Sequence, residues 1–420
     1  MIKSIEDVVN KQLCTGCGGC AYIEPERFEM EDTLEYGRRP FLSDSAVKTD
    51  GTALKICPGI EISRPRSDDY VNDVKLKHDL YKDWGPIYGV WEGYSNDQSI
   101  RFAGSSGGAT TALALYCLEQ EGMNNVLHTA GRIDIPYLNE TVVSTNRKEL
   151  LMRTGSRYSP ASPVEALGII EQLSSQSVFI GKPCDVAAVD KIRKVNKKID
   201  DNLGVVISFF CAGTPSVKGT LDLLENNKIF NPLSLKDLRF RGNGWPGLWT
   251  AKYKNESGEN RVKKLTYVES WGFLQKYRQW RCYICPDHTG EFADIAVGDP
   301  WYRKQEDDRV GRSLIIGRTK RGAEIIKGAA KAGYLTLESE DESLLSRSQP
   351  NLIVTRGALW GRLFALKLGK VETPKFTGFF LFRHWIKDLS WKQKIQSILG
   401  TYKRISIKRL KKKVELEKLI

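Results

Sequence analysis

The sequence predicts an α/β core with a mixed sheet, preceded by a small cysteine-rich segment and followed by a helical, basic tail. Short apolar runs typical of buried strands alternate with segments whose apolar residues recur at helical spacing. A chain of 420 residues also exceeds the size at which one hydrophobic core stops growing, so more than one domain is expected. We place the domains at residues 1–65, 76–345 and 346–420.

The first segment contains a cysteine triplet, Cys14, Cys17 and Cys20, with two residues between successive cysteines. Three thiolates at this spacing can take three corners of a cubane iron–sulfur cluster, which binds four cysteines, the last commonly followed by proline. Here the cysteine–proline corner is Cys57-Pro58, displaced by a long insertion, and Cys57 is the expected fourth ligand. Zinc sites usually comprise two separated cysteine pairs, and zinc remains the alternative. The pattern predicts a ferredoxin-like [4Fe-4S] segment.

The polar, proline-containing stretch 62–69 is predicted to be a linker into the core. The core itself is predicted from apolar strand-like runs and from amphipathic helical segments. The strand-like runs lie at 87–94, 177–180, 205–210 and 293–297, and the helical segments at 109–121 and 163–173. Residues 248–270 are predicted to form a hairpin with its turn at 255–259.

A loop of small residues, Ser105-Ser106-Gly107-Gly108, leads directly into the first of these helices. Small side chains let a ligand reach the backbone, and the unpaired N–H groups of a first helical turn favour an anion such as a cofactor phosphate. A helix capped by serine, with no ligand, explains the same pattern. Lys182, and Ser156 and Tyr158 in the segment Gly155–Pro160, are further candidates for cofactor contact, although each also fits an ordinary turn.

A second cysteine set comprises Cys184, Cys211 and the pair Cys282 and Cys285. Cys184 and Cys211 stand where an apolar strand gives way to a turn residue, and α/β folds gather functional groups at such strand ends. The four thiols are therefore candidates for a second cluster, with a four-thiolate zinc site as the alternative. Cys117 lies inside a helix without a motif and is expected to be a buried, inert thiol.

Two further segments and the histidines give weaker signals. The segments 241–247 and 298–301 are predicted to be turns, the first also a candidate substrate loop. The four histidines show neither ligand spacing nor pairing with a nucleophile, which argues against a hydrolytic triad. His288 follows Cys285 closely and is either a proton donor or, as we expect, a solvated surface histidine.

The formal net charge of +13 is concentrated in the tail. Residues 383–420 carry twelve Lys or Arg and three Asp or Glu, so nine of the excess positive charges lie there. The body is only mildly basic, so no nucleic-acid partner is expected. The tail, with aromatic residues at 376–391 and a basic run at 408–413, is predicted either to lie on an anionic membrane or to consist of core-packing helices with a solvated end.

The compartment follows from the cysteines and from the hydropathy of the chain. Nine cysteines without an N-terminal apolar run indicate the reducing cytoplasm, where clustered thiols more often hold metal than form disulfides. No segment is long and apolar enough to span a membrane. We therefore expect a cytoplasmic protein, with peripheral contact at the inner membrane face as the alternative placement.

Taken together, these motifs resemble the beta-subunit family of the coenzyme F420 hydrogenases, which also includes the chlorophyll-pathway reductases acting on 7-hydroxymethyl chlorophyll and on the 8-vinyl group. The resemblance covers roughly residues 10–330 and departs from the family in the long gap between Cys20 and Cys57. It rests on the triplet with Cys57-Pro58, Gly104–Gly108, Gly155–Pro160, Gly181–Asp185, Phe209–Gly213 and Arg281–Asp299. It implies FAD held against Ser105-Ser106-Gly107-Gly108, an inner [4Fe-4S] cluster on the second cysteine set, and an N-terminal cluster that relays electrons to it.

The implied function is that of a flavin-dependent iron–sulfur oxidoreductase. Electrons would pass from a one-electron donor through two [4Fe-4S] clusters to FAD and on to an organic substrate or a deazaflavin coenzyme, since clusters exchange single electrons and organic reductions take pairs. An acidic, ferredoxin-like donor would suit the basic surface. The alternatives are a non-catalytic electron-transfer subunit of a larger hydrogenase or dehydrogenase complex and an accessory protein of polysaccharide biosynthesis. A homo-oligomer is compatible with each of these three functions.

Overall fold

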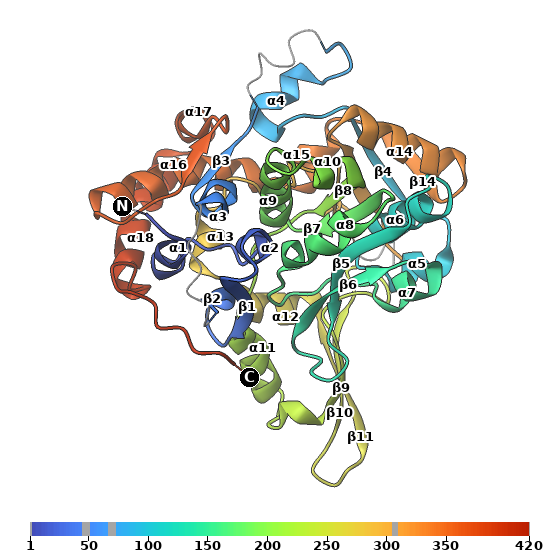
Figure 1. The fold of residues 1–420 in the computed structure, drawn as a ribbon, viewed down its shortest axis with the longest axis horizontal. Helices are drawn as coiled ribbons and strands as arrows, with labels where there is room; N and C mark the ends of the chain where they lie inside the picture. The colour runs from blue at the N-terminus through green and yellow to red at the C-terminus, as the bar shows by residue number, and fades with distance from the viewer. Residues whose placement is uncertain (1, 44–50, 66–72, 305–309, 420) are drawn as a thin grey trace.

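An eight-stranded mixed sheet forms the centre of the protein, as the computed structural model shows for residues 2–43, 51–65, 73–304 and 310–419 (Figure 1). This arrangement confirms the predicted α/β core with a mixed sheet. In sheet order the strands are β14 (Leu335–Glu340), β4 (Gly89–Ser95), β13 (Ser313–Gly317), β12 (Ile295–Gly298), β8 (Leu203–Phe209), β7 (Ser177–Gly181), β5 (Asn125–Gly131) and β6 (Asn139–Ser144).

The four central strands β12, β8, β7 and β5 are parallel, and antiparallel strands flank them on both sides. Successive residues of a strand point to opposite faces. Val178 and Ile180 accordingly pack into one core cluster and Phe179 into another. Burial on both faces explains why these strands appear in the sequence as continuous apolar runs rather than as alternating patterns.

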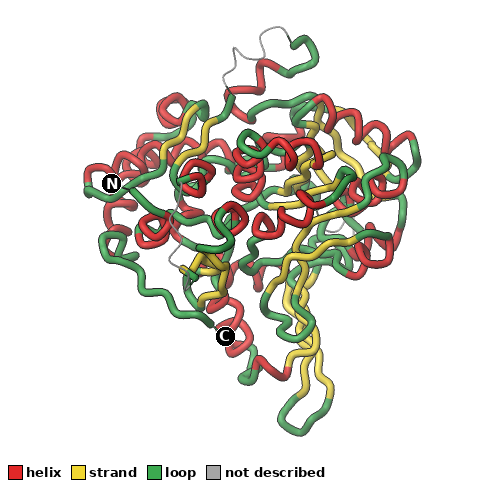
Figure 2. Tube along the Cα trace, viewed as in Figure 1, coloured by secondary structure: helices red, strands yellow, loops and turns green. Residues whose placement is uncertain are grey.

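Helices cover both faces of the sheet and complete three layers (Figure 2). On one face lie α6 (Ala109–Glu119) and α14 (Lys320–Lys331), and on the other α8 (Leu167–Gln172), α9 (Pro183–Arg193) and α10 (Lys197–Asn202). Remaining core helices are α4 (His78–Trp84), α5 (Gln98–Ala103), α7 (Arg147–Met152) and the 3₁₀ turn Pro163–Ala166. The helices predicted at 109–121 and 163–173 are thus present.

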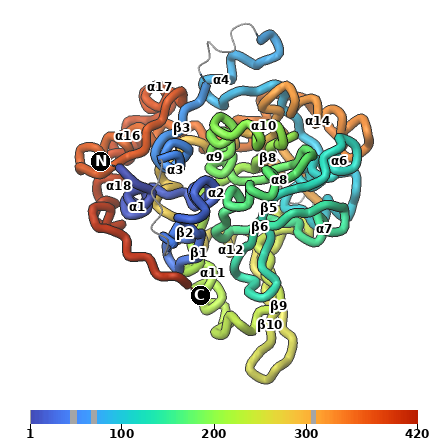
Figure 3. The backbone as a smooth tube through the Cα atoms, in the orientation of Figure 1, coloured from blue at the N-terminus to red at the C-terminus, as the bar shows by residue number. Residues whose placement is uncertain are grey.

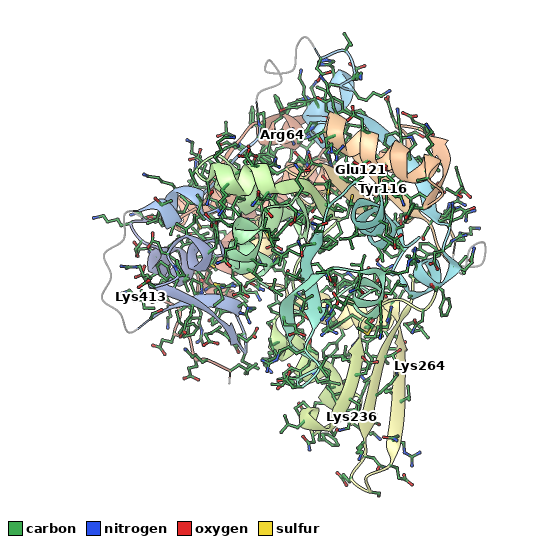
Figure 4. The ribbon with its side chains drawn as sticks, turned by 45° about the vertical axis from the view of Figure 1, so that its right-hand side comes forward. Arg64, Tyr116, Glu121, Lys236, Lys264 and Lys413 are labelled. Carbon is green, nitrogen blue, oxygen red and sulfur yellow. The ribbon has the colours of Figure 1, made fainter. Side chains whose placement is uncertain are left out.

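A smaller three-stranded sheet projects from the core at the bottom of Figure 1. The predicted hairpin is confirmed as the antiparallel pair β10 and β11, and β9 adds a third strand. The bounds are β9 (Leu235–Arg239), β10 (Leu248–Lys254) and β11 (Asn260–Thr266), with α11 (Val217–Asn226), 3₁₀ turns Pro232–Ser234 and Gln275–Tyr277 and α12 (Tyr267–Leu274) beside them. Helix α13 (Trp280–Tyr283) instead packs with the N-terminal segment and the C-terminal helices. Lys236 and Lys264 are labelled on this sheet in Figure 4.

The N-terminal segment is a compact set of short elements around its cysteines. It contains α1 (Ile5–Asn10), α2 (Gly19–Ile23), β1 (Phe28–Thr33), β2 (Gly37–Leu42), α3 (Thr52–Ile56) and β3 (Glu61–Ser63). Figure 3 shows it in blue between the core and the red C-terminal helices. Val8, Leu13 and Cys14 share one apolar cluster with Leu359 and Ile405 of that C-terminal part. Its ferredoxin-like character and the domain limits stay predictions.

The predicted linker is wrong for residues 62–65, and residues 66–69 lie outside the described part of the chain. Strand β3 pairs in parallel with β15 (Lys375–Thr377), and Ile62 is buried. Arg64 is buried too, because its guanidinium forms an ion pair with Glu291 and donates to the carbonyl oxygen of Tyr81 at 2.8 Å. The polar composition of this stretch suggested that it is exposed to solvent, whereas the charge of Arg64 is neutralised by Glu291 inside the protein.

The C-terminal extension consists of α15 (Leu344–Ser348), α16 (Leu352–Leu368), β15, α17 (Leu381–Lys387) and α18 (Trp391–Ile407). Beyond α18 the chain returns to the N-terminal segment, where the N–H of Leu419 donates to Asp32 O and Lys418 pairs with Glu29 and Glu31. Among the described residues, no helix is long and apolar enough to cross a membrane.

Candidate functional site

The four cysteines of the N-terminal segment lie close together, with Cys14 and Cys17 before α2, Cys20 within it and Cys57 directly after α3. Burial raises the pKa of Cys20 well above its ordinary value, and the nearby charges of Cys14, Cys17 and Cys57 raise it further. Burial also raises the pKa of Cys17 to about 11 and that of Cys57 to about 12. Cys14 and Cys17 are buried and Cys20 and Cys57 are partly exposed. Thiols with raised pKa values are poor thiolates by themselves, and metal binding is one way in which such a group ionises.

Backbone N–H groups of this segment point at the sulfur atoms. The N–H of Gly16 donates to Cys14 Sγ at 3.4 Å. The N–H of Gly19 lowers the pKa of Cys17 and that of Gly59 lowers the pKa of Cys57, although burial outweighs both effects. Gly16 and Gly18 have φ values of 69° and 93°, which glycine adopts readily. This backbone is shaped to surround a cluster of negatively charged sulfurs.

The second cysteine set also comes together. Cys184 lies in the first turn of α9, Cys211 follows β8, and Cys282 and Cys285 lie within and just after α13. Burial is the main cause of the raised pKa of Cys184, and the charges of Cys211 and Cys285 add to it. Burial raises the pKa values of Cys211 and Cys285 to about 12, and the nearby charge of Cys282 adds to both shifts. The four thiols therefore form one group.

Among the described residues, which include all eight cysteines, no three Cys, His, Asp or Glu side chains converge closely enough to hold one metal ion. The assignment of each set to an iron–sulfur cluster, with zinc as the alternative, therefore stays a prediction.

A buried ion pair lies between the two cysteine sets. Lys182 Nζ donates to Asp185 Oδ1 at 2.6 Å and to Ala161 O at 3.0 Å. Although burial opposes the charge of Lys182, the nearby charges of Asp185, Cys184 and Cys17 hold its pKa above its ordinary value. Because Lys182 is influenced by a thiolate from each set, the two sets adjoin the same ion pair.

A cavity of about 460 Å³ opens where the parallel strands β7, β8 and β12 end. This volume is typical of small-molecule and cofactor sites, and strand ends are where α/β folds bind ligands. Six of the seven predicted cofactor-contact residues line it, namely Ser105, Ser106, Gly108, Ser156, Tyr158 and Lys182, and Cys211 of the second set lines it too. Gly107 is not in the wall, because its N–H donates to Ser313 Oγ at 2.9 Å.

The N-terminus of α6 forms one wall of the cavity. Its N-cap is Gly108, with φ of 75° and no side-chain cap, so the alternative of a helix capped by serine is wrong. Ala109, Thr110 and Thr111 of the first turn line the cavity, where their N–H groups favour an anion. The two predicted loops meet here, since the N–H of Ser156 donates to Ser105 Oγ at 2.7 Å.

The sequence analysis missed a charged pair in the wall of the cavity, Arg241 and Asp299. Arg241 pairs with both carboxylate oxygens of Asp299 at 2.9 Å, and Trp245 Nε1 donates to the same carboxylate at 2.9 Å. The Arg241 guanidinium lies 4.9 Å from the ring of Tyr267 and 5.4 Å from that of Trp301. Both segments were predicted mainly as turns. The signal was an arginine in a glycine-rich loop and an aspartate directly after a buried strand.

The C-terminal extension also reaches the cavity, beyond the region of the sequence resemblance. Gln349, Asn351, Leu352 and Thr355 line it, and Gln349 Nε2 donates to Asp299 O at 3.2 Å. No local motif marks these residues. This part of the wall lies next to the Arg241–Asp299 pair.

His288 is not a solvated surface histidine. It lines the cavity, its Nδ1 lies 2.8 Å from Cys211 O, and burial lowers its pKa to about 4. The expected burial of Cys117, by contrast, is confirmed, with no exposed surface and a pKa raised to about 12 by burial.

His128, on the cavity wall, should make the stability of the folded chain sensitive to acid. Burial first, and the charge of Arg153 second, lower the pKa of His128 from 6.5 to about 4. Below pH 6.5 the unfolded chain therefore binds a proton at His128 that the folded chain does not bind. The free energy of unfolding falls as the pH drops from 6.5 to 4, by up to about 1.4 kcal/mol per pH unit. His128→Asn should flatten this slope in melting experiments at several pH values. The exposed His78→Asn control should follow the wild type, and parallel curves for His128→Asn would contradict the assignment.

Two family models match the chain. The model of the N-terminal part of the coenzyme F420 hydrogenase/dehydrogenase beta subunit matches residues 90–167, and that of its C terminus matches residues 175–343. Together they cover more than half of the chain. The matched region contains the cavity loop, both pocket walls around Arg241 and Asp299, and all four cysteines of the second set.

Individual relatives agree with the family models. The F420-dependent formate dehydrogenase subunit beta of Methanocaldococcus jannaschii is 26% identical over 252 residues, 60% of this chain and 62% of that subunit, so the match leaves more than a third of it uncovered. The coenzyme F420 hydrogenase subunit beta of Methanosarcina barkeri is 27% identical, over 59% of this chain and 80% of that subunit. Among solved structures, a chain of the F420-reducing [NiFe] hydrogenase complex from Methanosarcina barkeri matches with a TM-score of 0.51 and 22% identity, over 66% of this chain and 93% of that one, which supports the fold.

Proposed function

Because this chain belongs to the coenzyme F420 hydrogenase/dehydrogenase beta-subunit family, we propose that it is a flavin- and iron–sulfur-dependent oxidoreductase. It takes electrons from a one-electron donor and delivers them to an organic substrate or a deazaflavin coenzyme. One observation carries the proposal: Cys17 of the first group of four cysteines and Cys184 of the second both adjoin the Lys182–Asp185 pair, and the second group opens onto the cavity through Cys211.

In this proposal the outer site serves the electron donor. Cys14, Cys17, Cys20 and Cys57 would hold a [4Fe-4S] cluster in a ferredoxin-like segment, supported by their burial and by the N–H groups directed at their sulfurs. A ferredoxin-like donor is the proposed partner, because an acidic protein would be attracted to a chain with a net charge of +13.

The inner site would serve the substrate. Cys184, Cys211, Cys282 and Cys285 would hold the second [4Fe-4S] cluster. FAD would lie in the cavity with its phosphates at the first turn of α6, where no side chain caps the helix. Ser105, Ser106, Gly108, Ser156 and Tyr158 would contact it, whereas Gly107 would act by allowing close packing against β13. A bound flavin converts single electrons into the pairs that organic reductions require.

The Arg241–Asp299 pair would position the flavin loop. Arg241 Nη2 donates to Ser105 O, which ties the loop to the wall that carries Tyr267 and Trp301. Lys182 would act between the clusters rather than on the flavin, since Asp185 and Ala161 O already bind its ammonium. The cavity thus has one wall for the cofactor and an opposite wall, completed by Thr355 and Asn351, for a substrate.

A second candidate function is an electron-transfer subunit of a larger complex, favoured by the printed names of the relatives, which are subunits of hydrogenases or dehydrogenases. The two functions differ in what the isolated chain does. We expect the chain alone, purified without oxygen, to reduce coenzyme F420 with reduced methyl viologen as the one-electron donor. Turnover only after a larger partner copurifies would instead identify a relay subunit.

The donor and the accessory-protein alternative have their own tests. Undiminished substrate reduction with ferredoxin omitted and no other one-electron donor present would remove ferredoxin from the proposal. A colourless protein that copurifies with polysaccharide-assembly proteins would favour the accessory role.

A further inference from the structure

Helix α18 exposes the apolar side of its surface. Trp391, Ile395, Leu399 and Tyr402 are 78%, 54%, 59% and 57% exposed. Their spacing of four, four and three residues places them along one face of the helix. A helix that packs on a core normally buries such a stripe, so its exposure requires a cause.

The cause lies in how α18 packs against α16. The inward face of α18 carries Lys394, Ser397, Thr401 and Ile405, all of them buried. They fit because the facing helix α16 has glycines: a Cβ on Gly361 would lie 2.0 Å from Ser397 Oγ. Close packing of small side chains against glycine therefore fixes α18 with its apolar stripe outward. The exposure of the stripe is therefore a property of the folded C-terminal extension.

The other two helices extend the apolar surface. Phe364 of α16 and Phe382 of α17 are 40% and 54% exposed, and Leu368 and Ile386 beside them are also exposed. Trp360 connects them, with ring centroids 5.4 Å from Phe364 and 5.0 Å from Phe382. We call the outer side of these three helices, with these residues and the α18 stripe, the apolar face. The helices lie side by side at the left of Figure 1.

Lysines border the apolar face. Lys387 and Lys392 are exposed near the start of α18, Lys403 is exposed near its end, and the exposed run 411–413 follows it. Lys413 is labelled in Figure 4, at the edge of the molecule. Among the described residues, these lysines form no ion pair with an acidic side chain. Their charges are available to an external anion.

We propose that the apolar face binds an anionic membrane surface peripherally. Aromatic and aliphatic side chains would enter the boundary between headgroups and acyl chains, while lysines reach the acidic lipids. Tryptophan at the margin of such a face is typical of membrane interfaces. A protein partner fits less well, because lysine is depleted at protein–protein interfaces and this face is bordered by six.

The same helix connects this surface to the cavity. Thr355 of α16 lines the cavity, and Phe364 lies nine residues further along the helix, about 14 Å away. Membrane binding would therefore hold the cavity close to the bilayer. The inference stands apart from the proposed function, because it uses no residue of either cysteine set and its test does not require activity.

Vesicle sedimentation of the full chain tests the proposal. The wild type should bind vesicles of phosphatidylcholine with phosphatidylglycerol, bind vesicles of phosphatidylcholine alone much more weakly, and lose affinity at high salt. The triple variant Trp391→Ser, Ile395→Ser, Leu399→Ser should bind at least about tenfold more weakly. Replacing the lysines 411–413 with glutamine should lower binding on the order of 100-fold at low salt.

A matched control uses exposed apolar residues elsewhere. Phe230→Ser, Val262→Ser and Val268→Ser change side chains that are 68%, 58% and 70% exposed on or beside the projecting small sheet, and they should leave vesicle binding unchanged. Equal binding of the triple variant and the wild type would overturn the proposal. So would a triple variant that binds vesicles normally but loses a copurifying protein, which would identify a protein interface. Unchanged circular dichroism of all variants would show that folding is intact.

Discussion

Replacing Cys282 and Cys285 together with serine should remove about half of the iron, from about eight to about four atoms per chain, and abolish substrate reduction. The reason is geometric. These two side chains are the paired half of the second cysteine set, and Cys282 lies close to Cys211, which lines the cavity. The N-terminal set shares no residue with them, so its cluster should persist. Iron and sulfide analysis with electron paramagnetic resonance would detect one remaining reduced cluster.

Cys117→Ser is the matched control. Cys117 is fully buried inside α6 and belongs to neither set. It should retain all iron and full activity. If the double variant kept its full iron content, or if Cys117→Ser lost iron, the assignment of Cys184, Cys211, Cys282 and Cys285 to one cluster would be wrong.

Glu291→Gln should lower the free energy of unfolding by about 3–5 kcal/mol, the usual effect of breaking a buried ion pair from one side. Glu291 pairs with Arg64 and with Arg356, and the three side chains have 0%, 0% and 1% exposure. Burial opposes ionisation of Glu291, yet the charges of Arg356, Arg64 and Arg318 hold its pKa below the ordinary value. Without the carboxylate, the arginines would remain buried and uncompensated. Thermal and urea unfolding of the purified chain would measure the loss.

This ion pair joins the three parts of the chain. Arg64 follows β3 of the N-terminal segment, Glu291 follows the second cysteine set, and Arg356 belongs to α16. A matched control is Asp201→Asn, which breaks the exposed pair with Lys197 and should leave the unfolding transition in place. An equally small effect of Glu291→Gln would show that the three parts are not energetically coupled through this group.

The features found from sequence were those with local signatures. Continuous apolar runs indicated the buried strands, and the spacing of Cys14, Cys17 and Cys20 predicted three ligands of one iron–sulfur cluster. The loop before α6 was found because its small residues are consecutive. Cys184 and Cys211 were found because each follows a strand whose end is apparent in the sequence.

The features that sequence reasoning missed depend on contacts between distant residues. Arg241 and Asp299 are 58 residues apart, and only the fold brings them to one cavity wall. Arg64 looked like part of a polar linker because its partner Glu291 lies far along the chain. The aromatic and basic character of the tail was recognised, but the outward orientation of the apolar stripe of α18 follows from glycines in α16, which no periodicity within α18 reveals.

The most direct test of the central claim is the composition of the chain purified without oxygen. We predict about eight irons and eight sulfides with one FAD, a brown colour from the clusters, and flavin absorption after extraction, because each cubane binds four thiolates and the chain offers two such sets. Zinc in place of iron, with no flavin, would contradict the account, since neither electron relay nor hydride chemistry would then have a carrier.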